Sequence, residues 1–119
     1  MPGHLHFPVL AAVTLTLITA PATAGAQGSG DVRDLYQTRC ADCHGEDASG
    51  ELPGVPDLTQ APEVWARTDD TLLARTIAGV DSPASPIPMP PRGGHPDLSD
   101  AELRTLIIYM RTLATGQAH

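Results

Sequence analysis

The chain has 119 residues, a length typical of one domain, and its 14 acidic residues against seven arginines give a net charge of −7. This acidic balance, with no lysine at all, argues against nucleic-acid binding, which needs basic patches. It favours a soluble protein, and the charge fits either a partner with a basic face or a protein that is simply acidic and soluble. Aromatic residues make up only 3% of the chain, so its core is thin unless a disulfide, metal or cofactor adds to it.

The first predicted segment is a secretory signal peptide. Residues 7–20 are uncharged and mostly apolar, a proline ends the run, and small residues follow. Their Ala-x-Ala spacing predicts cleavage after Ala24 or Ala26. The run is shorter than the roughly 20 apolar residues of a membrane-spanning helix, which disfavours the alternative of an uncleaved anchor. We therefore expect 1–26 to be the signal peptide and 27–119 to be one periplasmic domain.

A helix is the first element predicted after this segment, with Asp31 as its N-cap and Cys40 near its end. Its apolar residues recur at i, i+3, i+4 and i+8 from Val32 onward, which places them on one helical face. Residues 45–56 are rich in glycine, proline and acidic side chains, and this composition predicts a loop.

Two further helices are expected in the middle of the chain. Pro62 is a suitable first residue for a short helix through Trp65. A longer helix is predicted to begin after a cap at Thr68 or Asp69, and Gly79 suits its C-terminal end.

The last helix has the clearest sequence signature. Ser99 and Glu102 have the spacing of a capping box, and Leu98 and Leu103 occupy the flanking positions of a hydrophobic staple. Apolar residues then repeat at helical spacing. Because no segment predicts a strand, the expected fold class is all-α, with three main helices joined by irregular loops.

Cys40, Cys43 and His44 form a C-x-x-C-H sequence, which is the attachment signature of haem c. Two thiols one helical turn apart reach the two vinyl groups of one haem, and the adjacent histidine is carried under the iron. A disulfide of the redox C-x-x-C type is the main alternative, but that motif belongs in a βαβ setting. A zinc site needs more ligands than two cysteines supply.

The iron of such a haem needs a second axial ligand or an open position. Met89 is the preferred candidate, and the alternative is that it only packs. It lies in the proline-rich segment 81–96, which predicts a stiff extended loop rather than a helix or a central strand. A stiff loop loses little entropy when it presents one sulfur. His95 is a rival that would give a bis-histidine iron. Met110 is a rival by residue type, but its place on an apolar helical face predicts a core residue.

The order of these motifs resembles the class I cytochrome c family. An N-terminal helix leads to C-A-D-C-H-G, a proline-containing loop follows, and Met-Pro-Pro-Arg-Gly-Gly precedes L-S-D-A-E-L and a C-terminal helix. The distal sequence is similar to that of short bacterial members, in which the methionine lies in a Met-Pro-Pro-basic-Gly loop. The resemblance implies a small class I fold around one covalently attached haem c.

The resemblance also implies roles for matching residues. Pro56 resembles the proline whose carbonyl accepts a hydrogen bond from the proximal His44, and Leu58 resembles a neighbour that packs on the haem. Tyr36 and Tyr109 are expected near the crossing of the terminal helices.

The resemblance leaves alternative roles open for Trp65 and Arg92. Trp65 is expected either to donate to a haem propionate or to pack in the core. Arg92 is expected to neutralise a propionate, to face a partner or to be solvated. The family often has glycine where this chain has Val32, and a ring of lysines around the haem edge that this chain lacks.

The expected function is periplasmic electron transport. With His44 and Met89 both on the iron, no position is open to substrate, so we expect single-electron, outer-sphere transfer between a redox protein donor and acceptor, without an enzymatic activity of its own. The alternatives are a haem c subunit of a dehydrogenase or oxidase complex, a five-coordinate enzyme or sensor, and a haem-free thiol protein. Contact with a membrane is expected only through partner complexes.

Overall fold

The computed structural model describes residues 2–5, 8–13, 15, 17–20, 29–83 and 85–116. The expected cleavage positions, Ala24 and Ala26, lie outside the described residues. The elements follow one another in this order: α1 (Ser29–Arg39), α2 (Ala41–His44), the 3₁₀ turn η1 (Leu58–Gln60), α3 (Pro62–Trp65), α4 (Asp69–Ala78), β1 (Val80–Ser82), β2 (Ser85–Met89), η2 (Pro91–Gly94) and α5 (Asp100–Thr115).

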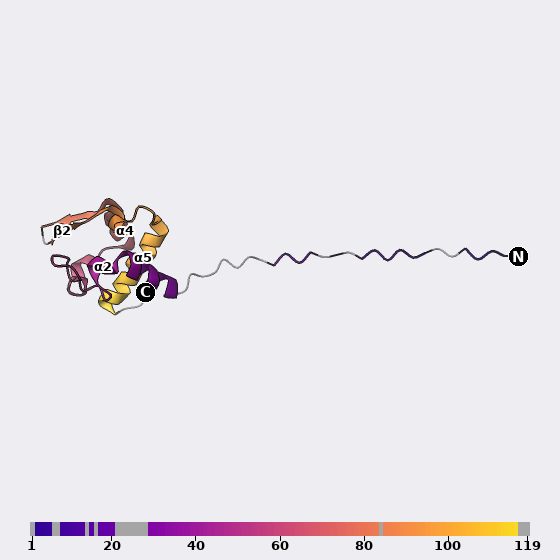
Figure 1. Cartoon of the computed structure of the whole chain (residues 1–119), viewed down its shortest axis with the longest axis horizontal. Helices are drawn as coiled ribbons and strands as arrows, with labels where there is room; N and C mark the ends of the chain where they lie inside the picture. The colour runs from indigo at the N-terminus through magenta and orange to yellow at the C-terminus, as the bar shows by residue number, and fades with distance from the viewer. Residues whose placement is uncertain are drawn as a thin grey trace.

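The described residues before position 21 form neither helix nor strand and run away from the folded body (Figure 1). Their apolar side chains face solvent, with Leu10 92% and Ile18 90% exposed. Among the described residues, no helix has both the length and the apolar character needed to cross a membrane.

Helix α1 begins at Ser29, so the expected N-cap Asp31 instead lies in the first helical turn. Its carboxylate there, and Arg39 in the last turn, both complement the helix dipole. The helix ends one residue before Cys40, and the separate turn α2 carries the rest of the C-x-x-C-H motif.

The predicted caps of the two longer helices are confirmed. The Thr68 side chain accepts a hydrogen bond from the backbone N–H of Thr71 at the start of α4, and Gly79 ends that helix with φ +84°. Ser99 and Glu102 form the complete reciprocal capping box of α5. Local sequence therefore sets both ends of α4 and the start of α5.

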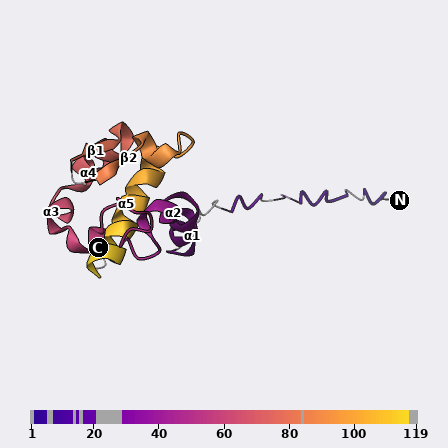
Figure 2. The ribbon, with the colours of Figure 1, turned by 60° about the vertical axis from the view of Figure 1, so that its left-hand side comes forward.

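Helix α5 is the centre of the fold, because α1 and α4 both pack against it (Figure 2). The main core cluster comprises Tyr36, Leu98, Leu103 and Leu106, all of them buried. The rings of Tyr36 and Tyr109 lie 5.5 Å apart between centroids and are tilted by 60°. The expected tyrosine contact between the terminal helices is therefore present.

A short antiparallel ribbon interrupts the otherwise helical fold. Val80 pairs with Met89 and Ser82 pairs with Ser85, so part of the segment expected as an extended loop is a strand. Pro86 and Pro88 are tolerated in β2 because both strands of a two-stranded ribbon are edges, where a missing N–H leaves no central ladder unpaired. The expected all-α class describes the helical framework. The expectation that no segment forms a strand is wrong for β1 and β2.

Candidate functional site

A cavity of about 430 Å³ opens among the helices and the ribbon. Five of the six residues expected to bind the cofactor line it, namely Cys40, His44, Pro56, Leu58 and Met89. Cys43 is the exception, since its side chain is exposed and is not among those that line the cavity. The volume is in the range of small-molecule sites.

The two cysteines are free rather than joined in a disulfide. They are held on one turn, because the backbone N–H of His44 donates to the carbonyl of Cys40 at 3.0 Å. Burial raises the pKa of the Cys40 thiol to about 11, so it is a neutral thiol at pH 7. Within the part of the chain that the structure describes, no cluster of three or more histidine, cysteine or acidic residues has the arrangement of a metal site.

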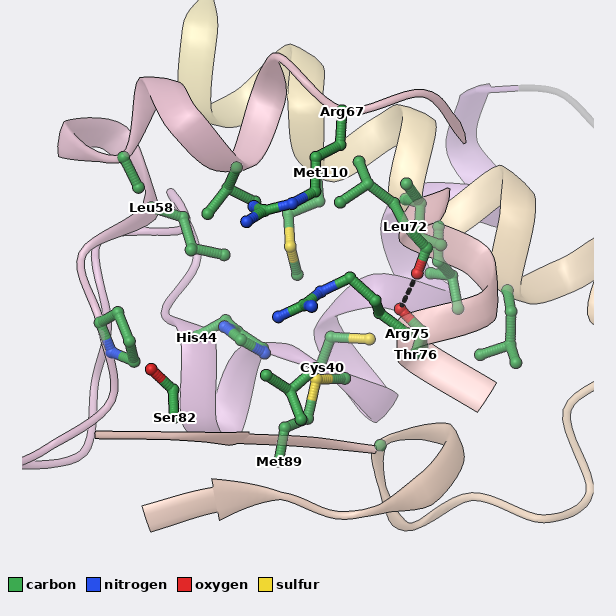
Figure 3. Close-up of a pocket in the computed structure, with 18 of the residues that line it drawn as sticks. Cys40, His44, Leu58, Arg67, Leu72, Arg75, Thr76, Ser82, Met89 and Met110 are labelled. Atoms are coloured by element: carbon green, nitrogen blue, oxygen red, sulfur yellow. Dashed lines mark hydrogen bonds between the residues drawn. The ribbon is translucent and has the colours of Figure 1, made fainter. Parts of the chain in front are cut away.

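The His44 imidazole points into the cavity (Figure 3). Its Nδ1 atom is buried and has no hydrogen-bond partner. Burial also lowers the pKa of His44 below its ordinary value, which favours the neutral ring. Neutral imidazole is the form that binds iron, so the ring, the nearby thiol and the apolar cavity together fit a haem.

The expected hydrogen bond from His44 to the Pro56 carbonyl is not formed. The loop is instead fastened to α2 through backbone groups, since the N–H of Gly50 donates to the carbonyl of His44 at 2.7 Å. A Cβ at Gly50 would lie 2.8 Å from the Val55 carbonyl oxygen and 3.3 Å from that of Pro56. Both carbonyl oxygens lie close to Gly50, whose φ of +88° favours glycine. Sequence reasoning did not single out this residue, and the signal for it is a glycine within a predicted loop.

Met89 is the last residue of β2, and its half-buried side chain reaches the cavity (Figure 3). Two glycines allow the distal loop to fold here. A Cβ at Gly79 would lie 2.9 Å from the Pro91 nitrogen and 3.0 Å from the Met89 carbonyl oxygen. A Cβ at Gly93 would lie 3.6 Å from the Met89 methyl carbon. The close approach of the backbone at Gly79 therefore positions the methionine.

Met110 has two roles in the structure. It packs against the core cluster, as expected from its helical face, and it also lines the cavity. In Figure 3 its sulfur enters from α5, on the side of the cavity away from the ribbon that carries Met89. Both methionines are therefore candidates by position, and only substitution separates them.

His95 also lines the cavity, but both of its ring nitrogens are engaged by Arg39. The Nε2–H donates to the Arg39 carbonyl at 2.8 Å, and Nδ1 accepts from the Arg39 guanidinium at 3.2 Å. Arg39 also pairs with Asp97 at 2.9 Å. This interlock ties the end of α1 to the distal loop and occupies the groups that a bis-histidine iron would need.

The anion-binding roles considered for Trp65 and Arg92 are not supported. The Trp65 indole N–H donates to the Leu58 carbonyl at 2.7 Å. The Arg92 guanidinium donates to the Leu98 carbonyl at 2.6 Å and pairs with Asp100 at 2.7 Å. Both side chains are engaged in holding loops to neighbouring segments.

Two arginines that sequence reasoning missed line the cavity instead. The guanidinium groups of Arg67 and Arg75 both extend into it in Figure 3. Arg75 is exposed at the rim of the cavity. It lies three residues after the buried Leu72 of α4, and this i, i+3 spacing is the sequence signal that could have placed it there.

Residues 30–114 match the family described as cytochrome c. The chain is 37% identical over 108 residues to the lupanine 17-hydroxylase [cytochrome c] of Pseudomonas sp, covering 91% of this chain and 14% of that protein. It is 34% identical over 97 residues to cytochrome c5 of Ectopseudomonas mendocina, covering 77% of this chain and 99% of that one.

A third relative is named as an oxidase subunit. The cbb3-type cytochrome c oxidase subunit CcoP of Rhodobacter capsulatus is 30% identical over 99 residues, covering 82% of this chain and 31% of that subunit. The chain thus spans less than a third of the hydroxylase and of the oxidase subunit, and nearly all of cytochrome c5.

Proposed function

Because the chain belongs to the cytochrome c family and therefore binds one covalently attached haem c, we propose that it is a periplasmic carrier of single electrons. In this proposal Cys40 and Cys43 attach the haem and His44 is the proximal ligand of its iron. Met89 is the distal ligand. The carrier works by outer-sphere transfer between a redox donor and a redox acceptor.

The observation that carries the proposal is the meeting of His44 and Met89 in one apolar cavity beside Cys40. The bound haem supplies a one-electron Fe(III)/Fe(II) couple, and methionine–histidine ligation raises its reduction potential. If His44 and Met89 both bind the iron, no position would remain on it for a substrate. This disfavours chemistry on a bound molecule and favours electron transfer alone.

The remaining lining residues hold the haem and exclude water. Pro56 and Leu58 line the cavity on the loop and η1, where we assign them packing contacts with the macrocycle. Apolar surroundings favour the less charged state of the iron centre, which is a second contribution to a high potential. Cys43 is exposed, so its thioether bond would lie at the outer edge of the site.

The test of the ligand set is a pair of matched variants, Met89→Leu and Met110→Leu, which conserve side-chain volume. Each is expressed in a periplasm with haem-attachment machinery and examined by absorption spectroscopy. We expect the wild-type protein and M110L to be low-spin and to show the weak far-red band of ferric iron bound to methionine sulfur. M89L should lose that band and, once reduced, bind carbon monoxide rapidly. Loss of the band in M110L but not in M89L would move the ligand to Met110.

The intact mass of the periplasmic protein tests both processing and attachment. We expect one haem and an N-terminus at Gly25 or Gln27, as cleavage after Ala24 or Ala26 requires. The exposed apolar residues before position 21 support removal of this segment, because a large exposed apolar surface is a liability in a soluble protein. A mass equal to that of the whole chain plus haem would contradict cleavage.

A second candidate function is that of a haem c subunit in a dehydrogenase or oxidase complex. It is favoured by the relatives named as a hydroxylase and as an oxidase subunit, of which this chain matches only a part. Purification from the native host separates the two functions. A monomer that exchanges electrons rapidly with a soluble partner supports the carrier, and a stable heteromer supports the subunit.

A further inference from the structure

The cavity combines an apolar lining with two inward guanidinium groups. Arg67 enters from the segment between α3 and α4, and Arg75 enters from α4 (Figure 3). The surrounding residues include Leu58, Leu72 and Ile107. Arg67 is half-buried and Arg75 is exposed, and both border the same apolar cavity. Two positive charges at the edge of one cavity favour an anionic partner there.

Neither guanidinium is paired with a carboxylate of the described residues. Within that part of the chain, the Arg67 guanidinium donates only to the backbone carbonyl of Glu63, at 3.1 Å. Arg75 makes no hydrogen bond or ion pair with any residue that the structure describes. By contrast, Arg92 is engaged by Asp100 within the protein. Arg67 and Arg75 are therefore the cations left for an anion in the cavity.

We propose that Arg67 and Arg75 each pair with one of the two propionates of the haem, and that these pairs hold both propionates ionised across neutral pH. A guanidinium forms two parallel hydrogen bonds to a carboxylate, so each pair also fixes the orientation of the haem edge. The inference deepens the proposed function and rests on the family's haem, but it does not depend on which methionine binds the iron.

The pairs have a defined effect on the iron. A positive charge near the haem stabilises Fe(II) over Fe(III), so removal of one guanidinium lowers the reduction potential. It also raises the pKa of the released propionate. As that propionate takes up a proton on acidification, its negative charge is lost and the potential rises. The reduction potential of the wild-type protein is thus independent of pH between about pH 6 and 8. The potential of a variant rises as the pH is lowered through this range.

Other charged or titratable side chains line the same cavity and are left unchanged in every variant. They are Glu63 from α3, His44 from α2, and Arg92 and His95 from the distal loop. The matched control is Arg33→Gln, because Arg33 is an exposed residue of α1 that does not line the cavity, and its loss changes the net charge by the same amount. Any effect of overall charge appears equally in this control.

The experiment measures the reduction potential of the haem-loaded R67Q, R75Q and R33Q proteins from pH 5 to 9. We expect R67Q and R75Q to lower the equilibrium constant for reduction by about tenfold at pH 8, which is 59 mV for one electron. Each should also acquire a slope with pH that R33Q lacks. Potentials and slopes equal to those of R33Q overturn the pairing for the residue concerned.

Two further measurements keep the result interpretable. Arg75→Lys and Arg67→Lys retain the charge, so each should restore most of the potential, and failure to do so would assign the effect to packing. The absorption spectrum of each variant is recorded in parallel. If an arginine variant keeps a low-spin haem with the far-red band and its potential is unchanged, only this inference is overturned. If the wild-type protein itself shows no low-spin haem, the proposed function is overturned.

Discussion

The hydroxyl of Tyr36 donates a hydrogen bond of 2.6 Å to the carbonyl oxygen of Gly45. The tyrosine is fully buried in α1, and Gly45 directly follows His44 at the end of α2. This bond links the core of the helical framework to the turn that carries the haem-binding motif. It therefore couples the stability of the fold to the position of His44.

The first prediction concerns this bond. We expect Tyr36→Phe to lower the free energy of unfolding by about 1–3 kcal/mol, because it leaves the buried Gly45 carbonyl with only the long hydrogen bond from the Ala48 N–H, at 3.4 Å. Tyr109→Phe is the matched control, since no hydrogen bond of its hydroxyl occurs among the described residues. Denaturant unfolding of the two haem-loaded variants measures the difference, and equal losses would show that the bond contributes nothing.

The same residue predicts a pH dependence. Burial raises the pKa of Tyr36 well above its ordinary value of 10.0. A raised pKa in the folded state means that the stabilisation is complete below pH 10.0 and is lost as the pH rises above it. The wild-type protein should lose up to about 1.4 kcal/mol per pH unit there from this group. In Y36F that contribution to the slope should be missing, and an identical alkaline slope would contradict the assignment.

The second prediction concerns the distal loop. Gly79→Ala forces a Cβ to within 3.0 Å of the backbone that carries Met89 and Pro91, so the loop has to move. Gly116→Ala is the control, because Gly116 also has a positive φ but has open space around it. We expect G116A to lose about 1 kcal/mol, because φ +68° and ψ 12° lie in the left-handed helical region. G79A should lose more, because φ +84° and ψ 159° lie in a region that is essentially limited to glycine. Only G79A should also weaken the far-red band, because only its Cβ meets the backbone of Met89. An intact band in G79A would show that this close approach does not position Met89.

The third prediction compares two ion pairs at the start of α4. Arg111 pairs with Asp69 and has a side chain only 12% exposed, whereas Arg104 pairs with Asp70 and is 41% exposed. Asp69→Asn leaves a nearly buried guanidinium without its carboxylate, and we expect a loss of about 2 kcal/mol. Asp70→Asn should cost less than about 1 kcal/mol. Both changes remove one charge from the same helical turn, so thermal unfolding of the pair isolates burial.

The fourth prediction concerns His95. Because Arg39 engages both ring nitrogens, we expect His95→Ala to keep the low-spin spectrum and the far-red band at room temperature. The variant should lose the band at a lower denaturant concentration than the wild-type protein, since the distal loop is no longer tied to α1. If the haem instead becomes high-spin in H95A, the histidine is an iron ligand and the proposed Met89 ligation is wrong.

Much of the framework was predictable because its signals are local. The capping box at Ser99 and Glu102, the Thr68 cap and the Gly79 terminus each depend on residues a few positions apart. The predicted start of α1, directly after Asp31, lies three residues beyond the observed start at Ser29, since acidic side chains are favoured both at a cap and in the first turn. The ribbon ending at Met89 was missed because prolines disfavour strands in general and are tolerated only at edges.

The sequence by itself determined the family, the haem c and the order of the helices, because C-x-x-C-H and the caps act through residues adjacent in the chain. Only the tertiary structure decided which polar groups are left to face the cavity. It engaged Trp65, Arg92 and His95 in hydrogen bonds elsewhere and turned Arg67 and Arg75 inward. These outcomes depend on partners far apart in the chain, whose proximity is set by the packing of α1 and α4 on α5.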